Sequence, residues 1–510
     1  MMFLPFNLPL FPLVSLIIAI MIFIPYKRFL SAKQTHHNQP PSPRKLPIIG
    51  NLHQLLGSNP HRSIQALTQN LGPLVLIQLG SVPVLVASSA EAAQEILKTH
   101  DVIFASRPKL NIIDTLTYGS KTIAFSPYGE YWRQVRSIAV LGVLSSRRVQ
   151  SFRRVREEET RLMIDQIGEN CGSLVDLGEL LNSLTNNIVC RVAFGRKFDG
   201  MTFSHLLERF VYLLGSFSVG NYIPWLSWVD RLNGLEARTK KTAEELDEIL
   251  EVVLEEHLIK RRAAEDDVGG GSYESQDLVD VLLDAQKENN QNTNNFTLHR
   301  DFVKAAITDI FAAGTDTTFS AMEWAISELI RHPKVMKTLQ QEVREIAQGK
   351  SMISEDDLEN MHYLHAVLKE TLRLHTPLPL LISRESTQHV KLMGYDIAAG
   401  TQVIINAWAI GRDPSLWEEA EKFRPERFLN SSIDYKGKHF EYLPFGAGRR
   451  GCPGIQFAIV IDELALANLV YKYDLALPDD VRGEDLDMSE LTGLTLHRKY
   501  PLVVVPNPCF

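Results

Sequence analysis

The stretch FGAGRRGCPG, residues 445 to 454, limits the possible folds of this chain more than any other feature. It places Cys452, one of four cysteines in 510 residues, among glycines and a proline, directly before an apolar run. Glycine lets a backbone turn sharply and approach a flat partner, and Pro453 fixes the turn before a helix expected to begin near Gly454. Because amides at a helix start and nearby arginines favour a thiolate, we expect a lowered pKa for this cysteine.

The spacing of the cysteines limits the kinds of metal or cofactor that this thiolate can bind. Cys171, Cys190 and Cys509 form no C-x-x-C pair with one another or with Cys452, which excludes a zinc knuckle and a disulfide framework. A single thiolate cannot complete a structural zinc site, but it can be the axial ligand of haem iron. A net charge of -8 also disfavours nucleic acid as the main partner.

The amino end predicts a membrane anchor. Residues 8 to 24 read LPLFPLVSLIIAIMIFI without a charge, and basic residues follow only on the carboxyl side. This pattern favours a single-pass signal anchor over residues 1 to 33, with the remaining chain in the cytosol. A cleaved secretory peptide is the alternative, but its basic start is missing. We expect a proline-rich hinge over residues 34 to 51 and a single domain over residues 52 to 510.

Residue patterning predicts a mainly α fold with a minor β-sheet region. The segment from 73 to 89 alternates around a glycine and a proline, which is typical of a hairpin. Residues 132 to 290 are mainly helical in pattern, and the longest helix is expected from about 298 to 330. Strands are expected between 376 and 409.

At this point the chain resembles the cytochrome P450 superfamily. The haem-binding pattern of that family, Phe-x-x-Gly-x-Arg-x-Cys-x-Gly, is met by Phe445, Gly448, Arg450, Cys452 and Gly454. The resemblance implies the cytochrome P450 fold and haem b, with iron ligated by Cys452. It further implies that Arg450 meets a haem propionate, Phe445 shields the sulfur side, and the two glycines allow close approach.

A second motif, KETLR, places Glu370 and Arg373 three residues apart on one helical face. Alone, such a pair is usually a solvated bridge that adds little stability. FRPERF supplies Arg427, and the resemblance implies a buried Glu-Arg-Arg cluster that holds the core behind the haem loop.

A third motif, AAGTDTT, lies inside the longest predicted helix. Gly314 weakens the helix there, and the hydroxyls of Thr317 and Thr318 can bond within their own turn, which favours a local widening. In the family this groove holds dioxygen. The resemblance implies that Thr317 hydrogen-bonds the activated oxygen and that Asp316 relays protons to it.

The fourth motif, WRQVR, places Trp132 and Arg136 four residues apart, on one side of a helix. By resemblance both side chains reach a haem propionate, as do Arg384 and Arg450.

Together the four motifs and the hinge resemble plant microsomal A-type enzymes of specialised metabolism. The implied function is a haem-thiolate monooxygenase that uses dioxygen to oxidise a small lipophilic molecule, such as a terpenoid, coumarin, alkaloid or other aromatic skeleton. By resemblance, the substrate meets the loop before Trp132 and six mostly apolar side chains: Phe311, Ala313, Leu378, Leu381, Ile382 and Leu494. Thr376 and Ser383 stand where relatives usually carry proline.

Electrons must come from outside the chain, because no G-x-G-x-x-G fingerprint follows a strand. The resemblance implies NADPH–cytochrome P450 reductase in the endoplasmic reticulum membrane, with Arg449, Lys436, Lys438 and Arg133 as candidates for its docking surface. Three alternatives stay open: aldoxime formation or dehydration, a haem-binding sensor without turnover, and a membrane-anchored scaffold without haem.

Overall fold

The computed structural model describes residues 38–55, 59–198, 201–266, 276–291, 298–491 and 493–509. The predicted anchor over residues 1 to 33 lies outside these ranges. Among the described residues, no helix is both long enough and apolar enough to cross a membrane. The described part of the predicted hinge runs beside the first strand, where the Leu76 amide donates to the Pro41 carbonyl at 2.9 Å.

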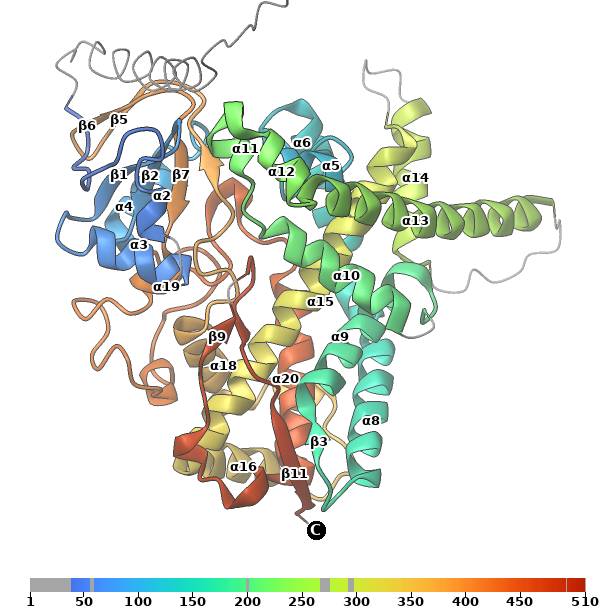
Figure 1. Cartoon of the computed structure of the whole chain (residues 1–510). Helices are drawn as coiled ribbons and strands as arrows, with labels where there is room; N and C mark the ends of the chain where they lie inside the picture. Colours follow the sequence, from blue (N-terminus) through green and yellow to red (C-terminus); the bar gives the residue numbers. More distant parts are fainter. Residues whose placement is uncertain are drawn as a thin grey trace, which may run out of the picture.

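Helix α15 (Arg300–Arg331) is the centre of the helical body, as Figure 1 shows. It packs against α9 (Leu177–Phe194), α18 (His362–Leu374) and α20 (Ile455–Lys472). Residues on all sides of α15 are buried, because neighbouring helices cover it around its circumference. The long helix predicted from about residue 298 to 330 is thereby confirmed.

The remaining helices surround this core. The longer ones are α3 (Pro60–Thr68), α6 (Glu130–Ile138), α8 (Arg153–Glu169), α10 (Met201–Leu214), α13 (Leu235–Asp266), α14 (Leu278–Gln291) and α16 (Pro333–Ala347). The short ones are α2 (Leu52–Leu55), α4 (Ala90–Gln94), α5 (Asn111–Leu116), α7 (Ser146–Ser151), α11 (Val219–Tyr222), α12 (Trp228–Leu232), α17 (Glu355–Leu358) and α19 (Ala407–Ile410).

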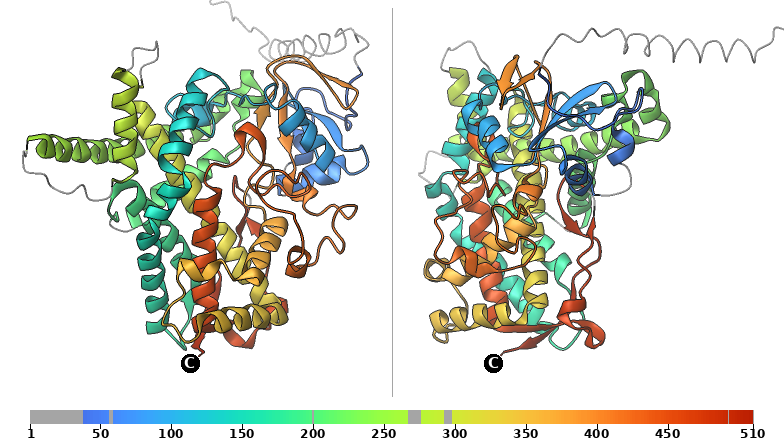
Figure 2. Two further views of the ribbon diagram at one scale, coloured as in Figure 1. Left: turned by 180° about the vertical axis from the view of Figure 1, so that it is seen from behind. Right: turned by 90° about the vertical axis from the view of Figure 1, so that its left-hand side faces the viewer.

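A four-stranded sheet of order β1-β2-β7-β4 lies at one edge of the helical body in both Figure 1 and Figure 2. The predicted hairpin is confirmed as β1 (Leu74–Leu79) and β2 (Val82–Ala87). Strand β7 (Gln402–Ile405) runs parallel to β2, and β4 (Arg384–Glu385) pairs antiparallel with β7. This sheet brings the residue 377 to 385 segment next to the helical body.

Three smaller sheets complete the described strands. They consist of β5 (Val390–Leu392) with β6 (Tyr395–Ile397), β9 (Glu490–Leu491) with β10 (His497–Arg498), and β3 (Val175–Asp176), β11 (Val503–Pro508) and β8 (Tyr473–Ala476). The chain just before β10 is fixed on α15, because the Leu496 carbonyl accepts hydrogen bonds from Ser320 at 2.6 Å and from the Trp324 indole at 2.8 Å.

A buried ion pair joins α8 to α17. The Arg156 guanidinium is fully buried and donates to both carboxylate oxygens of Glu355, at 2.6 and 2.9 Å. Removing one partner of such a pair leaves the other charge buried without compensation, which is costly. This pair therefore links two segments that are far apart in the sequence.

We expect Arg156→Met to lower the free energy of unfolding by about 3 kcal/mol or more, because Glu355 loses its partner. Arg154→Met is the matched control: Arg154 also pairs with a glutamate, at 2.6 Å, but is 89% exposed, so a change of about 0–1 kcal/mol is expected. Denaturant unfolding followed by circular dichroism measures both. Equal losses in the two variants would contradict the role of burial.

Candidate functional site

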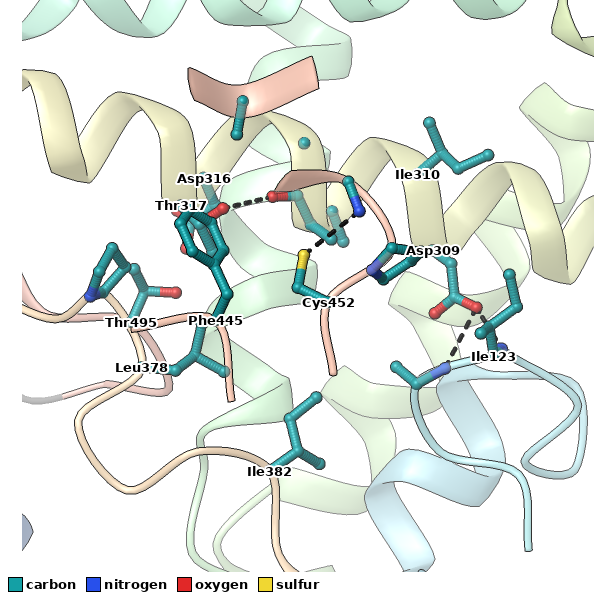
Figure 3. Close-up of a pocket in the computed structure, with 18 of the residues that line it drawn as sticks. Ile123, Asp309, Ile310, Asp316, Thr317, Leu378, Ile382, Phe445, Cys452 and Thr495 are labelled. Carbon is teal, nitrogen blue, oxygen red and sulfur yellow. Dashed lines mark hydrogen bonds between the residues drawn. The ribbon is translucent and has the colours of Figure 1, made fainter. Parts of the chain in front are cut away.

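A cavity of about 270 Å³ lies between α15, the loop that carries Cys452, and three further segments. These segments are residues 122 to 125, residues 377 to 382, and residues 494 to 495. Figure 3 shows Cys452 beside α15, which runs along one side of the cavity. Its wall is mostly apolar, and the polar groups are concentrated near the cysteine and on α15.

The backbone around Cys452 presents the sulfur to the cavity. The Cys452 amide donates to the Phe445 carbonyl at 3.0 Å, and the Gly454 amide donates to the sulfur at 3.4 Å. Burial raises the pKa of the Cys452 thiol, while the Gly454 amide and the charge of Arg136 act in the opposite direction. The lowered pKa expected from the sequence is therefore wrong for the protein alone, because burial outweighs the amide and the cation.

The two glycines of the motif meet different surroundings. Gly448 has a φ of +69°, and a Cβ atom there would come within 2.3 Å of the Leu97 carbonyl oxygen. Only glycine fits at that position. At Gly454 a Cβ atom would meet only the sulfur of Cys452, at an ordinary 3.9 Å, so the protein atoms described here do not require glycine there.

Four arginines line the cavity near the cysteine: Arg107, Arg136, Arg384 and Arg450. Burial, followed by repulsion from Arg384 and Arg136, lowers the pKa of Arg450 to about 9. Burial and repulsion from its three neighbours likewise place the pKa of Arg107 well below its usual value. A group of buried like charges fits an anionic ligand, which supplies the missing countercharge.

The cavity therefore fits haem, with Cys452 available to iron and the arginines available to the two carboxylates of a porphyrin. Arg107 was missed by the sequence analysis. It stands alone before a proline in a loop, without a repeat or a partner at helical spacing, so no sequence pattern identified it.

The predicted propionate ligands are held by backbone carbonyls. Arg136 donates to Gly451 at 2.6 Å, Arg384 donates to Ala447 at 3.0 Å, and Arg450 donates to Ala105 at 2.7 Å. Trp132 is different: its indole donates to the Ile123 carbonyl at 3.0 Å, and Trp132 does not line the cavity. Its contact with a propionate stays a prediction.

Helix α15 places Asp316 and Thr317 at the cavity, where Figure 3 shows them together. The Thr317 hydroxyl donates to the Ala313 carbonyl one turn earlier, at 2.7 Å. Asp316 pairs through Oδ1 with Nε2 of His497 at 3.1 Å, a partner that the sequence analysis did not identify. The α-helical assignment is continuous through this motif.

Glu370, Arg373 and Arg427 meet in the core. Glu370 is fully buried and accepts from Arg373 at 2.7 and 2.8 Å, from Arg427 at 3.0 Å and from the Arg424 amide at 2.8 Å. Arg373 also donates to carbonyls of the residue 411 to 422 segment. Its hydrogen bonds therefore join α18 to the chain that leads toward the cysteine loop.

Five of the six predicted substrate contacts line the cavity: Ala313, Leu378, Leu381, Ile382 and Leu494. Phe311 does not line this cavity, and its contact with a substrate stays a prediction. Its ring stacks on Phe194 at 4.9 Å and meets Phe203 edge to face at 4.8 Å, inside an aromatic cluster beside the cavity. Helical rotation over six residues turns Phe311 away from the face that carries Thr317.

Several further cavity residues were missed. Helix α10 contributes an apolar edge, made up of Phe210, Val211 and Leu214. Asp309 lines the wall from α15 and accepts hydrogen bonds from the amides of Ile123 and Ala124. Burial raises the pKa of Asp309 to about 7, against the effect of those amides. Thr376 donates to the Leu372 carbonyl and is not part of the wall.

A thiolate loop, an arginine cluster and an acid-hydroxyl pair around one cavity define a haem-thiolate site. The sequence profile of the family "Cytochrome P450" matches residues 40–504. The chain belongs to the cytochrome P450 family and is a monooxygenase whose cofactor is a cysteine-ligated haem. Electrons from NADPH through a separate reductase are typical of the family.

Similar proteins come from plants and from an animal. A "3-beta-hydroxylase" of Tanacetum parthenium is 56% identical over 96% of each chain, and a "Norfluorocurarine oxidase" of a Strychnos species is 53% identical over 98% of each. A solved structure of a zebrafish cytochrome P450 with progesterone matches with a TM-score of 0.74 at 26% identity, covering 89% of this chain and all of that one. The match to plant A-type enzymes is thereby confirmed.

We expect Glu370→Ala to yield protein without bound haem, because Arg373 and Arg427 are left as buried charges without a carboxylate. Haem content per protein, measured by pyridine haemochrome, tests this expectation. Glu418→Ala is the control, since Glu418 is 77% exposed in its pair with Arg424. Normal haem content in Glu370→Ala would refute the structural role of the cluster.

Replacing Cys452 by alanine should remove the carbon monoxide band typical of thiolate ligation and abolish turnover, since no other described cysteine reaches the cavity. Cys171→Ala, Cys190→Ala and Cys509→Ala should retain both. The reduced carbon monoxide difference spectrum distinguishes these outcomes. A thiolate-type band in Cys452→Ala would contradict the assignment of Cys452 as the ligand of the haem iron.

Proposed function

We propose that this enzyme oxidises a small lipophilic plant specialised metabolite by inserting one oxygen atom from dioxygen. The observation that carries the proposal is the mostly apolar cavity that faces Cys452 and is bordered by Asp316 and Thr317. Terpenoid, coumarin, alkaloid and other aromatic skeletons suit such a wall, because apolar burial supplies most of their binding energy.

Haem bound at Cys452 supplies dioxygen binding and the redox chemistry that cleaves the O–O bond. The overall reaction consumes the substrate, dioxygen, two electrons and two protons, and yields the oxidised product and water. The residues of the chain carry out the remaining tasks. Leu378, Leu381 and Ile382 orient the substrate and exclude water, which strengthens every electrostatic interaction inside the cavity.

Two residues of α15, Asp316 and Thr317, are proposed to deliver protons to the cavity. The Thr317 hydroxyl, which already donates to its own helix, is a hydrogen-bond partner for the oxygen that is being reduced. Asp316 holds one carboxylate oxygen at His497 and passes protons toward the cavity. These roles agree with the family resemblance of the motif that contains them.

The names of the relatives support oxidation without selecting a substrate. One relative is named for hydroxylation at a 3-beta position and another for oxidation of norfluorocurarine, at nearly equal identity to this chain. Similarity of this degree therefore does not determine the substrate. The exposed Lys436, Lys438, Arg449 and Arg133 are the proposed docking surface for the reductase, and the endoplasmic reticulum membrane is the proposed location.

The test is a screen of the enzyme with its reductase, in microsomes, against a panel of plant metabolites. The expected result is an NADPH-dependent product whose mass has increased by one oxygen atom. Conversion of aldoximes or of their amine precursors would instead support the aldoxime alternative. Haem binding without consumption of NADPH on any compound would favour a sensor.

With the substrate identified, Thr317→Ala should keep the thiolate-type spectrum but lower product formed per NADPH by about tenfold, with peroxide released instead, because the oxygen being reduced loses a positioned hydrogen-bond partner and proton delivery becomes less efficient. Thr315→Ala is the control, since Thr315 lies on the same helix but does not line the cavity. Equal coupling in both variants would contradict the role of Thr317.

A further inference from the structure

The carboxylate of Asp316 has two oxygens in different surroundings. Oδ1 pairs with Nε2 of His497 at 3.1 Å. Oδ2 is buried and has no hydrogen-bond partner among the described residues, while Asp316 itself lines the cavity. One oxygen is thus held by a titratable ring, and the other is buried without a partner among the described residues, in a side chain that borders the cavity.

His497 is held in place for this contact. The preceding carbonyl, that of Leu496, accepts hydrogen bonds from Ser320 and Trp324 of α15. The imidazole ring itself stacks on Phe319, with ring centroids 5.5 Å apart and an interplanar angle of 25°. The ring therefore has little freedom to leave Asp316.

Carboxylates from two helices act on His497: Asp316 and Glu323 from α15, and Glu208 from α10. Arg498 follows His497 on β10. Burial is the largest influence and opposes a charged ring, but the three carboxylates outweigh it and raise the pKa of His497 above its usual value. Glu208 is 57% exposed, so one of the carboxylates that act on the ring is solvated and another, Asp316, borders the cavity.

We propose that His497 is the proton donor that recharges Asp316 from solvent during dioxygen reduction. This inference rests on the proposed function, in which Asp316 delivers protons to the cavity. Neither the relatives nor the motifs of the sequence pointed to this residue. Its side chain reaches the acid from a short strand of the carboxyl end, more than 180 residues away in the sequence.

The proton balance is simple. The N–H bond at Nε2 breaks and an O–H bond forms at Oδ1, which leaves a neutral imidazole and a neutral carboxyl group. Rotation about the Cβ–Cγ bond of Asp316 then turns the proton toward the cavity, where the oxygen being reduced accepts it. Asp316 is again anionic, and Nε2 of the neutral His497 ring takes up the next proton from solvent while the carboxyl group is turned toward the cavity.

The first experiment measures the pairing without turnover. Carbon-13-labelled histidine in the full-length, reduced, carbon-monoxide-bound enzyme is titrated by NMR, and the His497 signal is identified as the one missing in His497→Gln. Asp316→Asn should lower the pKa of His497 by about one unit or more, because an opposite charge is removed. An unchanged pKa would overturn the proposal.

The second experiment follows NADPH consumption with the reductase as a function of pH. His497 in the wild type loses its proton as pH rises through its raised pKa, so consumption should fall over that interval. His497→Gln keeps a hydrogen-bond donor but cannot titrate. This variant should retain the thiolate-type carbon monoxide band and lose this pH dependence. It should also consume NADPH about tenfold more slowly, because a positioned general acid accelerates a reaction by ~10²-fold or more and water can take over only part of that role.

His257→Gln is the matched control. His257 is also buried and pairs through Nε2 with an aspartate, Asp277, at 2.8 Å, and it does not line the cavity. Its pH profile should match the wild type. A wild-type profile in His497→Gln would overturn the proposal. If that variant binds no haem, His497→Phe serves to identify the His497 signal, and the titration of Asp316→Asn decides alone. Neither measurement needs an identified substrate, so a metabolite screen without product counts against the proposed function only.

Discussion

The buried carboxylate of Glu370 is the interaction on which the arrangement of the site depends. It is fully buried, and three donor groups from Arg373, Arg424 and Arg427 converge on it. A buried ion pair rarely adds much stability over apolar packing, but it is specific, because only one geometry satisfies all of its partners. Arg373 extends this network to carbonyls of the segment that precedes the cysteine loop. The position of Cys452 relative to α15 therefore depends on a charge network outside the cavity.

In contrast to the paired charges around Glu370, the arginines at the cavity repel one another. Here Arg107, Arg136, Arg384 and Arg450 lie together, and burial with mutual repulsion lowers the pKa of Arg107 and of Arg450. Groups in such surroundings bind an anion strongly, because the anion removes the repulsion and replaces lost hydration. The charges around Glu370 are thus paired within the chain, whereas the arginine cluster is suited to the carboxylates of the cofactor.

Residue pattern and motif resemblance predicted the helical core, the hairpin and most of the cavity. They failed where the outcome depends on the direction or the surroundings of a side chain. Phe311 has the right residue type and the right helix but points into an aromatic cluster, because six residues of helix place it about 120° around the axis from Thr317. The pKa of Cys452 depends on burial by segments far away in the sequence, which no local motif reports. Arg107 and His497 enter the site from a loop and from a short strand, where periodicity carries no information.

Helix α15 places two acidic side chains at the cavity, Asp309 and Asp316, seven residues apart, and their partners separate their roles. Asp309 accepts backbone amides of Ile123 and Ala124, so it ties the loop that forms one wall to the helix that forms another. Burial raises the pKa of Asp309 to about 7, yet its partners are amides, which cannot take up or release a proton in this range. Asp316 instead meets a histidine, whose ring exchanges protons near neutral pH. The same residue type on one helix therefore shapes the cavity at one position and conducts protons at the other, and the difference lies entirely in the partner that the fold supplies.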